Sequence, residues 1–212
     1  MESPARILVA ISRQMGAGGA YVGQALARRS ALRYIDREIL QEAAKVLGRD
    51  DRELESLEER VTSVWTRMAG ILSWGAPEAP YVPPPIPTVL EDDLFATEAE
   101  IIRGLAARED GVFVGRAAGW VLRGRPGLLS VFLHAPEAAR IRRVVQAYSL
   151  AEDEARHLIR HSDQQRSRFL TSVRGCDWLD ASTYDLCFDT SRVEVDEVVD
   201  LLAGLVSRRQ TA

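Results

Sequence analysis

The 212-residue chain has few cysteines and no long apolar stretch, and each shortage excludes a class of protein. Its two cysteines, Cys176 and Cys187, lie 11 positions apart without the paired spacing of a zinc site, so we expect no structural zinc and a reducing compartment. The longest apolar runs, such as 7–11 and 128–133, have the length of a strand, and no basic region followed by an apolar stretch stands at the start. The sequence therefore predicts a cytoplasmic protein without a membrane span or a membrane partner.

Lysine is almost absent from this sequence. Of its 27 basic residues only Lys45 is a lysine, and the other 26 are arginines. A site that needs positive charge must therefore use arginine, whose planar fork pairs two donors with a phosphate or a carboxylate. The formal net charge is −4, and acidic and basic residues are interleaved along the chain, so we expect no nucleic-acid partner.

Short apolar segments alternate with amphipathic ones through most of the chain. The strands predicted from this pattern lie at 6–11, 32–35, 111–115, 128–133 and 184–189. The predicted helices lie at 20–30, 38–47, 51–72, 91–108, 117–123, 136–148, 152–172 and 195–206. Because strands that alternate with helices form parallel sheets covered on both faces, the sequence predicts a single α/β domain over 1–212 with a parallel five-stranded sheet flanked by helices.

Residues 50–108 interrupt this alternation with a helical insertion. Its first helix, 51–72, carries a broad apolar stripe, and a homodimer through the long helices and the proline-rich arm is one interpretation. Six of the eleven residues between 77 and 87 are prolines, which remove backbone donors and fix backbone angles. We therefore expect a semi-rigid proline-rich arm at 76–90.

A glycine-rich segment, SRQMGAGG at 12–19, joins the first predicted strand to the first predicted helix. Backbone N–H groups converge in such a turn and the helix N-terminus adds positive potential, which predicts a phosphate site. The residues expected to hold the phosphates of a nucleotide are Ser12, Gly16, Ala17, Gly18, Gly19 and Ala20. Compared with the pattern G-x-x-x-x-G-K-[ST], Arg13 stands at the first glycine, Gly19 at the lysine and Ala20 at the hydroxyl residue. A plain glycine turn without a ligand is the alternative.

Six segments occur in an order that is typical of one family. The first two are ISRQMGAGG at 11–19 and YIDREI at 34–39. The later ones are GR at 115–116, LHAPEAARIRR at 133–143, RHSDQQR at 160–166 and YDLCFDTS at 184–191. Together they resemble the cytidylate-kinase-like branch of the P-loop nucleoside monophosphate kinases, in whose signature the loop lysine is absent. The resemblance covers about 6–40 and 111–205 but not the residues between.

This resemblance implies a P-loop kinase fold with a helical substrate lobe at 50–108 and a helical, arginine-bearing lid at 150–172. It implies ATP and Mg²⁺ as cofactors and a nucleoside monophosphate such as CMP or dCMP as acceptor. Arg116 matches the family arginine that grips the acceptor's phosphate, and Asp163 belongs to the R-x-x-D-x-x-R spacing of the lid, which we assign to substrate binding. Arg160 and Arg166 match lid arginines that close over the transferring group and are our catalytic candidates.

Two departures from the family pattern leave alternatives open. Ala117 stands where the family enzymes have an aspartate that meets the acceptor's sugar, so a kinase for a different small molecule is one alternative. Gly19 in place of the lysine favours another, a catalytically inactive nucleotide-binding regulatory protein. Among catalytic candidates, Arg13 is the residue that we expect to supply the missing charge. Asp36 is a candidate substrate-binding carboxylate near metal or acceptor, and the N-cap of the following helix is its other interpretation.

The remaining charged residues of the second half predict no metal site. His157 and His161 lie four positions apart, but their neighbours are arginines, which favours a solvated helix face over a zinc site. Arg140, Arg142 and Arg143 are either lid charges or a helix surface paired with acidic neighbours, and Arg140 is the one we retain as a lid candidate.

Overall fold

The structure is a computed structural model that describes residues 6–36, 88–115, 118–174 and 177–211. The helices expected at 38–47 and 51–72, the proline-rich segment 77–87 and Arg116 lie outside the described residues. The architecture below is that of the described ranges.

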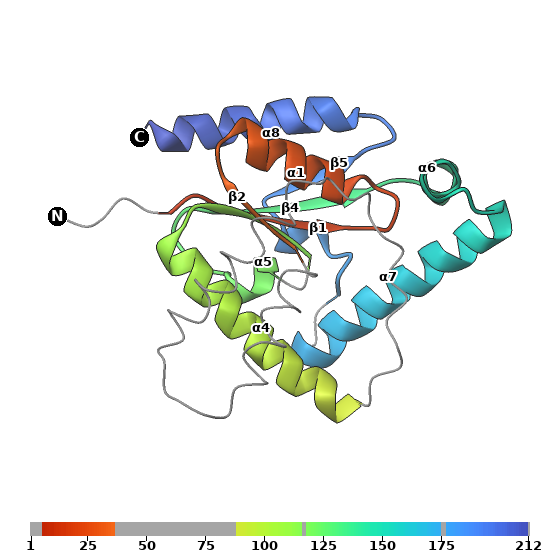
Figure 1. The fold of residues 1–212 in the computed structure, drawn as a ribbon, viewed down its shortest axis with the longest axis horizontal. Helices are drawn as coiled ribbons and strands as arrows, with labels where there is room; N and C mark the ends of the chain where they lie inside the picture. The colour runs from red at the N-terminus through yellow and green to blue at the C-terminus, as the bar shows by residue number, and fades with distance from the viewer. Residues whose placement is uncertain (1–5, 37–87, 116–117, 175–176, 212) are drawn as a thin grey trace.

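Five parallel strands form one sheet at the centre of the molecule, which confirms the predicted fold class (Figure 1). They are β1 (Leu8–Arg13), β2 (Arg33–Asp36), β3 (Gly111–Val114), β4 (Leu128–His134) and β5 (Leu186–Asp189). Their order across the sheet is β2-β3-β1-β4-β5, so β1 lies in the middle and pairs with both β3 and β4. Since all strands run the same way, their carboxyl ends share one edge, where α/β proteins bind their ligands.

Two helices, α1 (Gly19–Arg29) and α8 (Val195–Gln210), cover one face of the sheet (Figure 1). A capping box at Glu194 and Glu197 begins α8, and Arg208 and Arg209 in its last turn suit the negative end of the helix dipole. Alternate residues of the strands point into this layer, and the fully buried residues there include Val9, Val22, Leu26, Val112, Val131 and Leu202.

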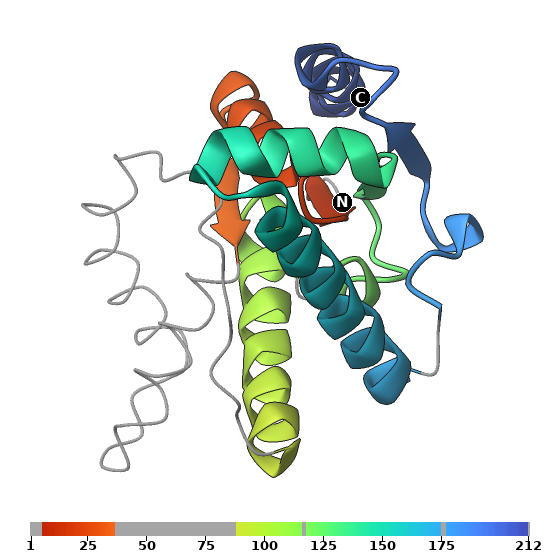
Figure 2. The same cartoon turned by 90° about the vertical axis from the view of Figure 1, so that its right-hand side faces the viewer.

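The opposite face is covered by α4 (Thr88–Arg108), the short α5 (Ala118–Val121) and the far end of α7 (Glu152–Arg174) (Figure 2). The other set of alternate strand residues packs there, with Phe113 and Phe132 against Ile102, Leu122 and Trp178. The helix α6 (Glu137–Tyr148) follows β4 and packs against the start of α7, where the two helices share a third, smaller cluster with Met15. A single 3₁₀ turn, Ala181–Thr183, precedes β5.

The observed elements differ from the predicted ones mainly at their ends. The first strand begins at Leu8 and extends to Arg13, beyond the predicted end at 11, because Ser12 and Arg13 still pair with Phe132 and Leu133 of β4. The helix predicted at 91–108 begins at Thr88 and so enters the segment 76–90 that was expected to be a proline-rich arm. Cys187 is an exposed free cysteine, because β5 is an edge strand of the sheet.

Candidate functional site

The turn between β1 and α1 lies at the carboxyl edge of the sheet, next to its central strand. Gly16 and Gly18 have φ angles of 80° and 83°, a left-handed conformation that glycine adopts without strain. Gly18 is the N-cap of α1 and has no side chain to cap the helix. Within the described residues, the amides of Gly16, Gly18 and Gly19 have no hydrogen-bond acceptor. Converging open amides at a helix N-terminus form an anion-binding concavity.

The two ends of the predicted phosphate segment play different parts. Ser12 belongs to β1, and its hydroxyl faces the Tyr184 hydroxyl on the α4 side of the sheet, where it partly offsets the rise that burial causes in the pKa of Tyr184. Ala20 lies in the first turn of α1 and carries no hydroxyl to offer a metal ion. The open amides thus come from the three glycines Gly16, Gly18 and Gly19, because the Ala17 amide donates to the Gln14 carbonyl over 3.2 Å.

Arg13 occupies the space that a side chain at position 19 would need. A Cβ built on Gly19 would lie 2.7 Å from the Cβ of Arg13 and closer still to its Cγ. At the other end of the side chain, a Cβ built on Gly115 would overlap Nη1 of Arg13 and lie 3.1 Å from its Cζ. The arginine therefore crosses from the start of α1 to the end of β3, in contact with a glycine at each place. Its guanidinium lies at the carboxyl edge of the sheet.

Asp36 ends β2 at the same edge, in register with Val114, the residue before Gly115. Burial raises the pKa of the Tyr34 hydroxyl, and the Asp36 carboxylate raises it further while Arg13 opposes the rise. These effects place Asp36 and Arg13 around one buried phenol. A carboxylate here is the kind of oxygen donor that Mg²⁺ prefers. The described parts of the chain contain no group of three or more histidine, cysteine, aspartate or glutamate side chains that could hold a metal ion.

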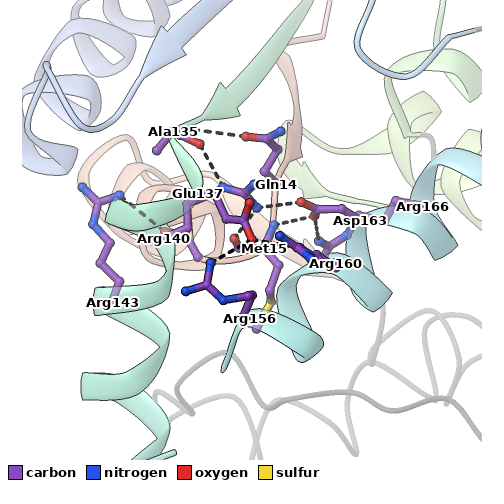
Figure 3. A network of polar contacts seen from close by, with 11 residues as sticks. Gln14, Met15, Ala135, Glu137, Arg140, Arg143, Arg156, Arg160, Asp163 and Arg166 are labelled. Carbon is purple, nitrogen blue, oxygen red and sulfur yellow. Dashed lines mark hydrogen bonds and ion pairs between the residues drawn. The ribbon is translucent and has the colours of Figure 1, made fainter. Parts of the chain in front are cut away.

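The lid residues Arg160, Asp163 and Arg166 all lie on α7, but the structure separates their roles (Figure 3). Arg160 donates from Nε to Glu137 at the start of α6 over 3.0 Å and is 62% exposed. This contact and the field of Arg156 hold the pKa of the Glu137 carboxyl below its usual value. Arg166 donates from Nη1 to Asp163 Oδ1 over 3.3 Å. Asp163 itself points at the glycine-rich loop.

Two further arginines, Arg140 and Arg143 of α6, reach the loop backbone (Figure 3). The sequence predicts Arg140 as a lid charge, whereas for Arg143 it leaves a lid charge and a helix surface as alternatives. Their spacing of three positions puts both on one face of α6 and was the signal that could have identified them. Arg140 is 7% exposed and pairs with Asp163 Oδ2 over 2.6 Å.

Comparison with known proteins identifies a family that this chain matches. A model of the Cytidylate kinase-like family matches residues 8–192 of the chain. Cytidylate kinase of Sulfolobus acidocaldarius is 29% identical over 113 residues, which cover 53% of this chain and 61% of that protein. Cytidylate kinase of Pyrococcus abyssi is 34% identical over 102 residues, 48% of this chain and 55% of that protein. The chain spans little more than half the length of the curated relatives it matches.

Solved structures show the same fold. An uncharacterized protein from Eubacterium ventriosum superposes with a TM-score of 0.70 at 22% identity, covering 95% of this chain and 99% of that one. Shikimate kinase from Bacteroides thetaiotaomicron superposes with a TM-score of 0.52 at 16% identity, covering 95% and 98% of the two chains. Within the ranges that the structure describes, no helix is both long and apolar enough to cross a membrane.

Proposed function

Because the chain belongs to the cytidylate kinase-like family, we propose that it transfers the γ-phosphate of ATP to a small phosphate acceptor, with CMP and dCMP as the first candidates. One observation supports the proposal: relative to the common phosphate-loop pattern, the glycine and the basic residue have changed places between positions 13 and 19. In phosphate loops with the pattern G-x-x-x-x-G-K, the first residue is a glycine and the lysine follows six positions later. Here an arginine stands first, and its side chain fills the space beside the glycine that replaces the lysine.

Arg13 would bring the positive charge of the loop to the phosphates. Phosphoryl transfer needs little covalent help from a protein, so positioning and neutralisation of charge account for most of the catalysis. A guanidinium is always charged and presents a planar fork that matches two phosphate oxygens. The open amides of Gly16, Gly18 and Gly19 would hold the β-phosphate, and Arg13 would approach it from the β3 side.

Two other proposed site residues must break their present contacts before they can reach a bound nucleotide. Arg160 would leave Glu137, and Arg166 would leave Asp163, when the lid arginines close over the transferring phosphoryl group. Arg116, which lies outside the described residues, is proposed to bind the acceptor's phosphate. Asp163 was assigned to the substrate from its spacing, and the structure gives its carboxylate contacts to the loop and to Arg140.

Magnesium would reach the site with the nucleotide. Mg²⁺ is commonly held by phosphate oxygens together with one or two carboxylates. Asp36 fits this part, since its carboxylate lies at the carboxyl edge near Arg13. The ion would supply charge neutralisation at the phosphates, and Asp36 would orient it.

A nucleotide-binding protein without turnover is the second candidate, and the absence of the loop lysine favours it. The two candidates differ in one measurement: the release of ADP from Mg-ATP by the purified protein offered CMP, dCMP, UMP, AMP and GMP separately. We expect ADP release with a pyrimidine monophosphate above a control without acceptor. If ATP binds but no nucleotide elicits release, the kinase proposal for these acceptors is wrong, and shikimate-sized or sugar acceptors become the next panel.

A further inference from the structure

Met15 of the glycine-rich loop is held by α6 and α7 through its N–H, its carbonyl and its side chain. Its N–H donates to Asp163 Oδ1 over 2.9 Å, and its carbonyl accepts from Arg140 Nη1 over 3.1 Å. Its side chain is 5% exposed and packs in the third cluster, whose other buried members are Ile141, Val144, Ala155 and Ile159. The helix pair therefore fixes the position of this residue by a hydrogen bond donated, one accepted and an apolar contact.

The next residue, Gly16, is held in a similar way. Its carbonyl accepts from Arg143 Nη1 over 3.4 Å, and the same guanidinium donates to the Oγ1 of Thr190 over 2.8 Å and to its carbonyl over 2.5 Å. A Cβ on Gly16 would lie 2.9 Å from the carbonyl oxygen of Arg140, so the loop backbone lies directly on α6. Arg143 thus joins the loop, α6 and the turn after β5.

These contacts orient the loop for an anion. A carbonyl oxygen that faced a phosphate would repel it, whereas an amide hydrogen attracts it. Two consecutive carbonyls, those of Met15 and Gly16, are turned toward arginines of α6. The amide of Met15 is also occupied, by Asp163, and that of Ala17 donates to the Gln14 carbonyl, which leaves the amides of Gly16, Gly18 and Gly19 to meet the ligand. The ion pair of Arg140 and Asp163 is partly buried and connects these contacts, because each partner also binds Met15.

We propose that Arg140, Arg143 and Asp163 are positioning residues that set the phosphate-binding shape of the loop, so that α6 and the adjoining part of α7 support the loop from behind. This inference deepens the proposed function and rests on it, since it assumes that the loop binds phosphate. It assigns the central aspartate of R-x-x-D-x-x-R to the loop and leaves Arg160 and Arg166 to contact the nucleotide. Arg140 and Arg143 act through the backbone of Met15 and Gly16.

The neighbouring residues Arg143 and Arg142 provide a matched test. Arg143 is half-buried on the loop, whereas Arg142 is exposed one position earlier on the same helix. Alanine at either position removes one positive charge, so a general loss of anion attraction would affect both variants equally. The probe is inorganic pyrophosphate, which carries no base or sugar, and its dissociation constant is measured by isothermal titration calorimetry in the full chain.

We expect Arg143→Ala to weaken pyrophosphate binding about tenfold or more, the size of one lost hydrogen bond to a charged group. Arg142→Ala should stay within about twofold of the wild type. Arg143→Lys keeps the charge but cannot form the fork to Thr190 and Gly16, so it should remain weakened. Asp163→Asn, which keeps an acceptor for Met15 but loses the charge opposite Arg140, should also weaken binding while the thermal transition stays cooperative.

Each outcome separates this inference from the proposed function. If the wild type binds pyrophosphate and Arg143→Ala binds it as tightly, the positioning role is wrong and the kinase proposal is untouched. Equal weakening by Arg142→Ala and Arg143→Ala would also overturn it, because charge alone would then account for the effect. If the wild type binds neither pyrophosphate nor ATP, the proposed function itself fails.

Discussion

Positions 13 and 19 depart from the common phosphate-loop pattern together, and the contact between them gives the reason. A lysine at position 19 would place its Cβ within 2.7 Å of the Arg13 Cβ, so the two long side chains exclude each other. A loop can therefore carry a glycine at 13 with a lysine at 19, or an arginine at 13 with a glycine at 19. Each arrangement delivers one positive charge to the same edge of the sheet.

This reciprocity predicts the behaviour of a double exchange. Arg13→Gly should lower kcat by about a hundredfold, because it removes the charge that we propose to meet the transferring phosphates. Gly19→Lys alone should be similarly impaired, because its side chain collides with Arg13. The double variant Arg13→Gly with Gly19→Lys recreates G-x-x-x-x-G-K and should recover at least about tenfold over either single variant. Steady-state ADP release measures all three.

The ATP dissociation constant of each variant is measured as a control, so that an effect on binding can be separated from an effect on turnover. Arg13→Gly that leaves kcat at the wild-type level, whatever it does to the ATP dissociation constant, would contradict the catalytic role of Arg13. A double variant no better than the worse single variant would contradict the reciprocity. Circular dichroism and the melting temperature identify a variant that has simply lost its fold.

At the scale of helices, α7 carries one arginine near the loop and another that faces solvent. Arg166 lies next to Asp163 near the loop, whereas Arg168 is exposed two positions later on the same helix. A charge that meets the phosphoryl group mainly in the transition state should affect turnover more than ground-state affinity. We therefore expect Arg166→Ala to lower kcat by more than it raises the ATP dissociation constant, with Arg168→Ala close to wild type. Equal losses in both constants would show that Arg166 acts only in binding.

The contact between α6 and α7 should also depend on pH. Arg160 and Arg156 hold the pKa of Glu137 below its ordinary value of 4.5, so the ionised carboxylate stabilises the folded state. This contribution is complete above the ordinary value and is lost as the pH falls through the lowered, folded value. Melting temperatures of the wild type and Glu137→Gln should therefore differ near neutral pH and converge as the pH falls through the lowered pKa of Glu137. A difference that persists unchanged in acid would assign the effect to packing.

At the scale of the whole molecule, one sheet separates two apolar layers, and α8 closes one of them. Leu202 is completely buried in that layer, whereas its neighbour Leu201 is 53% exposed. Leu202→Ala should lower the free energy of unfolding by about 2–5 kcal/mol, and Leu201→Ala by less than about 1 kcal/mol. Equilibrium urea denaturation measures both. Similar values for the two variants would show that α8 contributes little to the stability of the sheet.

The strand and helix order was predictable because apolar runs and amphipathic periods are local properties of the sequence. The end of β1 was not, since Ser12 and Arg13 become strand residues only through pairing with Phe132 and Leu133, which lie far away in the chain. The same limit applies to the site. The glycine loop and the departure at Gly19 are visible in the sequence, but the contact of Arg13 with Gly115 depends on β3 lying beside β1.

The contact of Met15 with Asp163 likewise joins positions that the sequence separates by 148 residues. The spacing R-x-x-D-x-x-R identifies Asp163 as a candidate site residue but does not show which residue its carboxylate contacts. The division of residues 1–212 into one kinase domain with a helical lobe remains a prediction, because 37–87 lie outside the described residues. A homodimer through the long helices also remains a prediction. Light scattering coupled to size-exclusion chromatography measures the oligomeric state directly.

The arginine at position 13 and the glycine at position 19 change the covalent reactivity of the loop. Reagents that acylate a lysine amine, including nucleotide analogues carrying an acyl phosphate, find no amine in this loop, since the one lysine of the chain is Lys45. Dicarbonyl reagents that condense with a guanidinium would instead modify Arg13, and bound nucleotide should protect it. A survey of ATP-binding proteins by amine labelling would therefore miss this loop, whereas guanidine labelling with and without nucleotide would detect it.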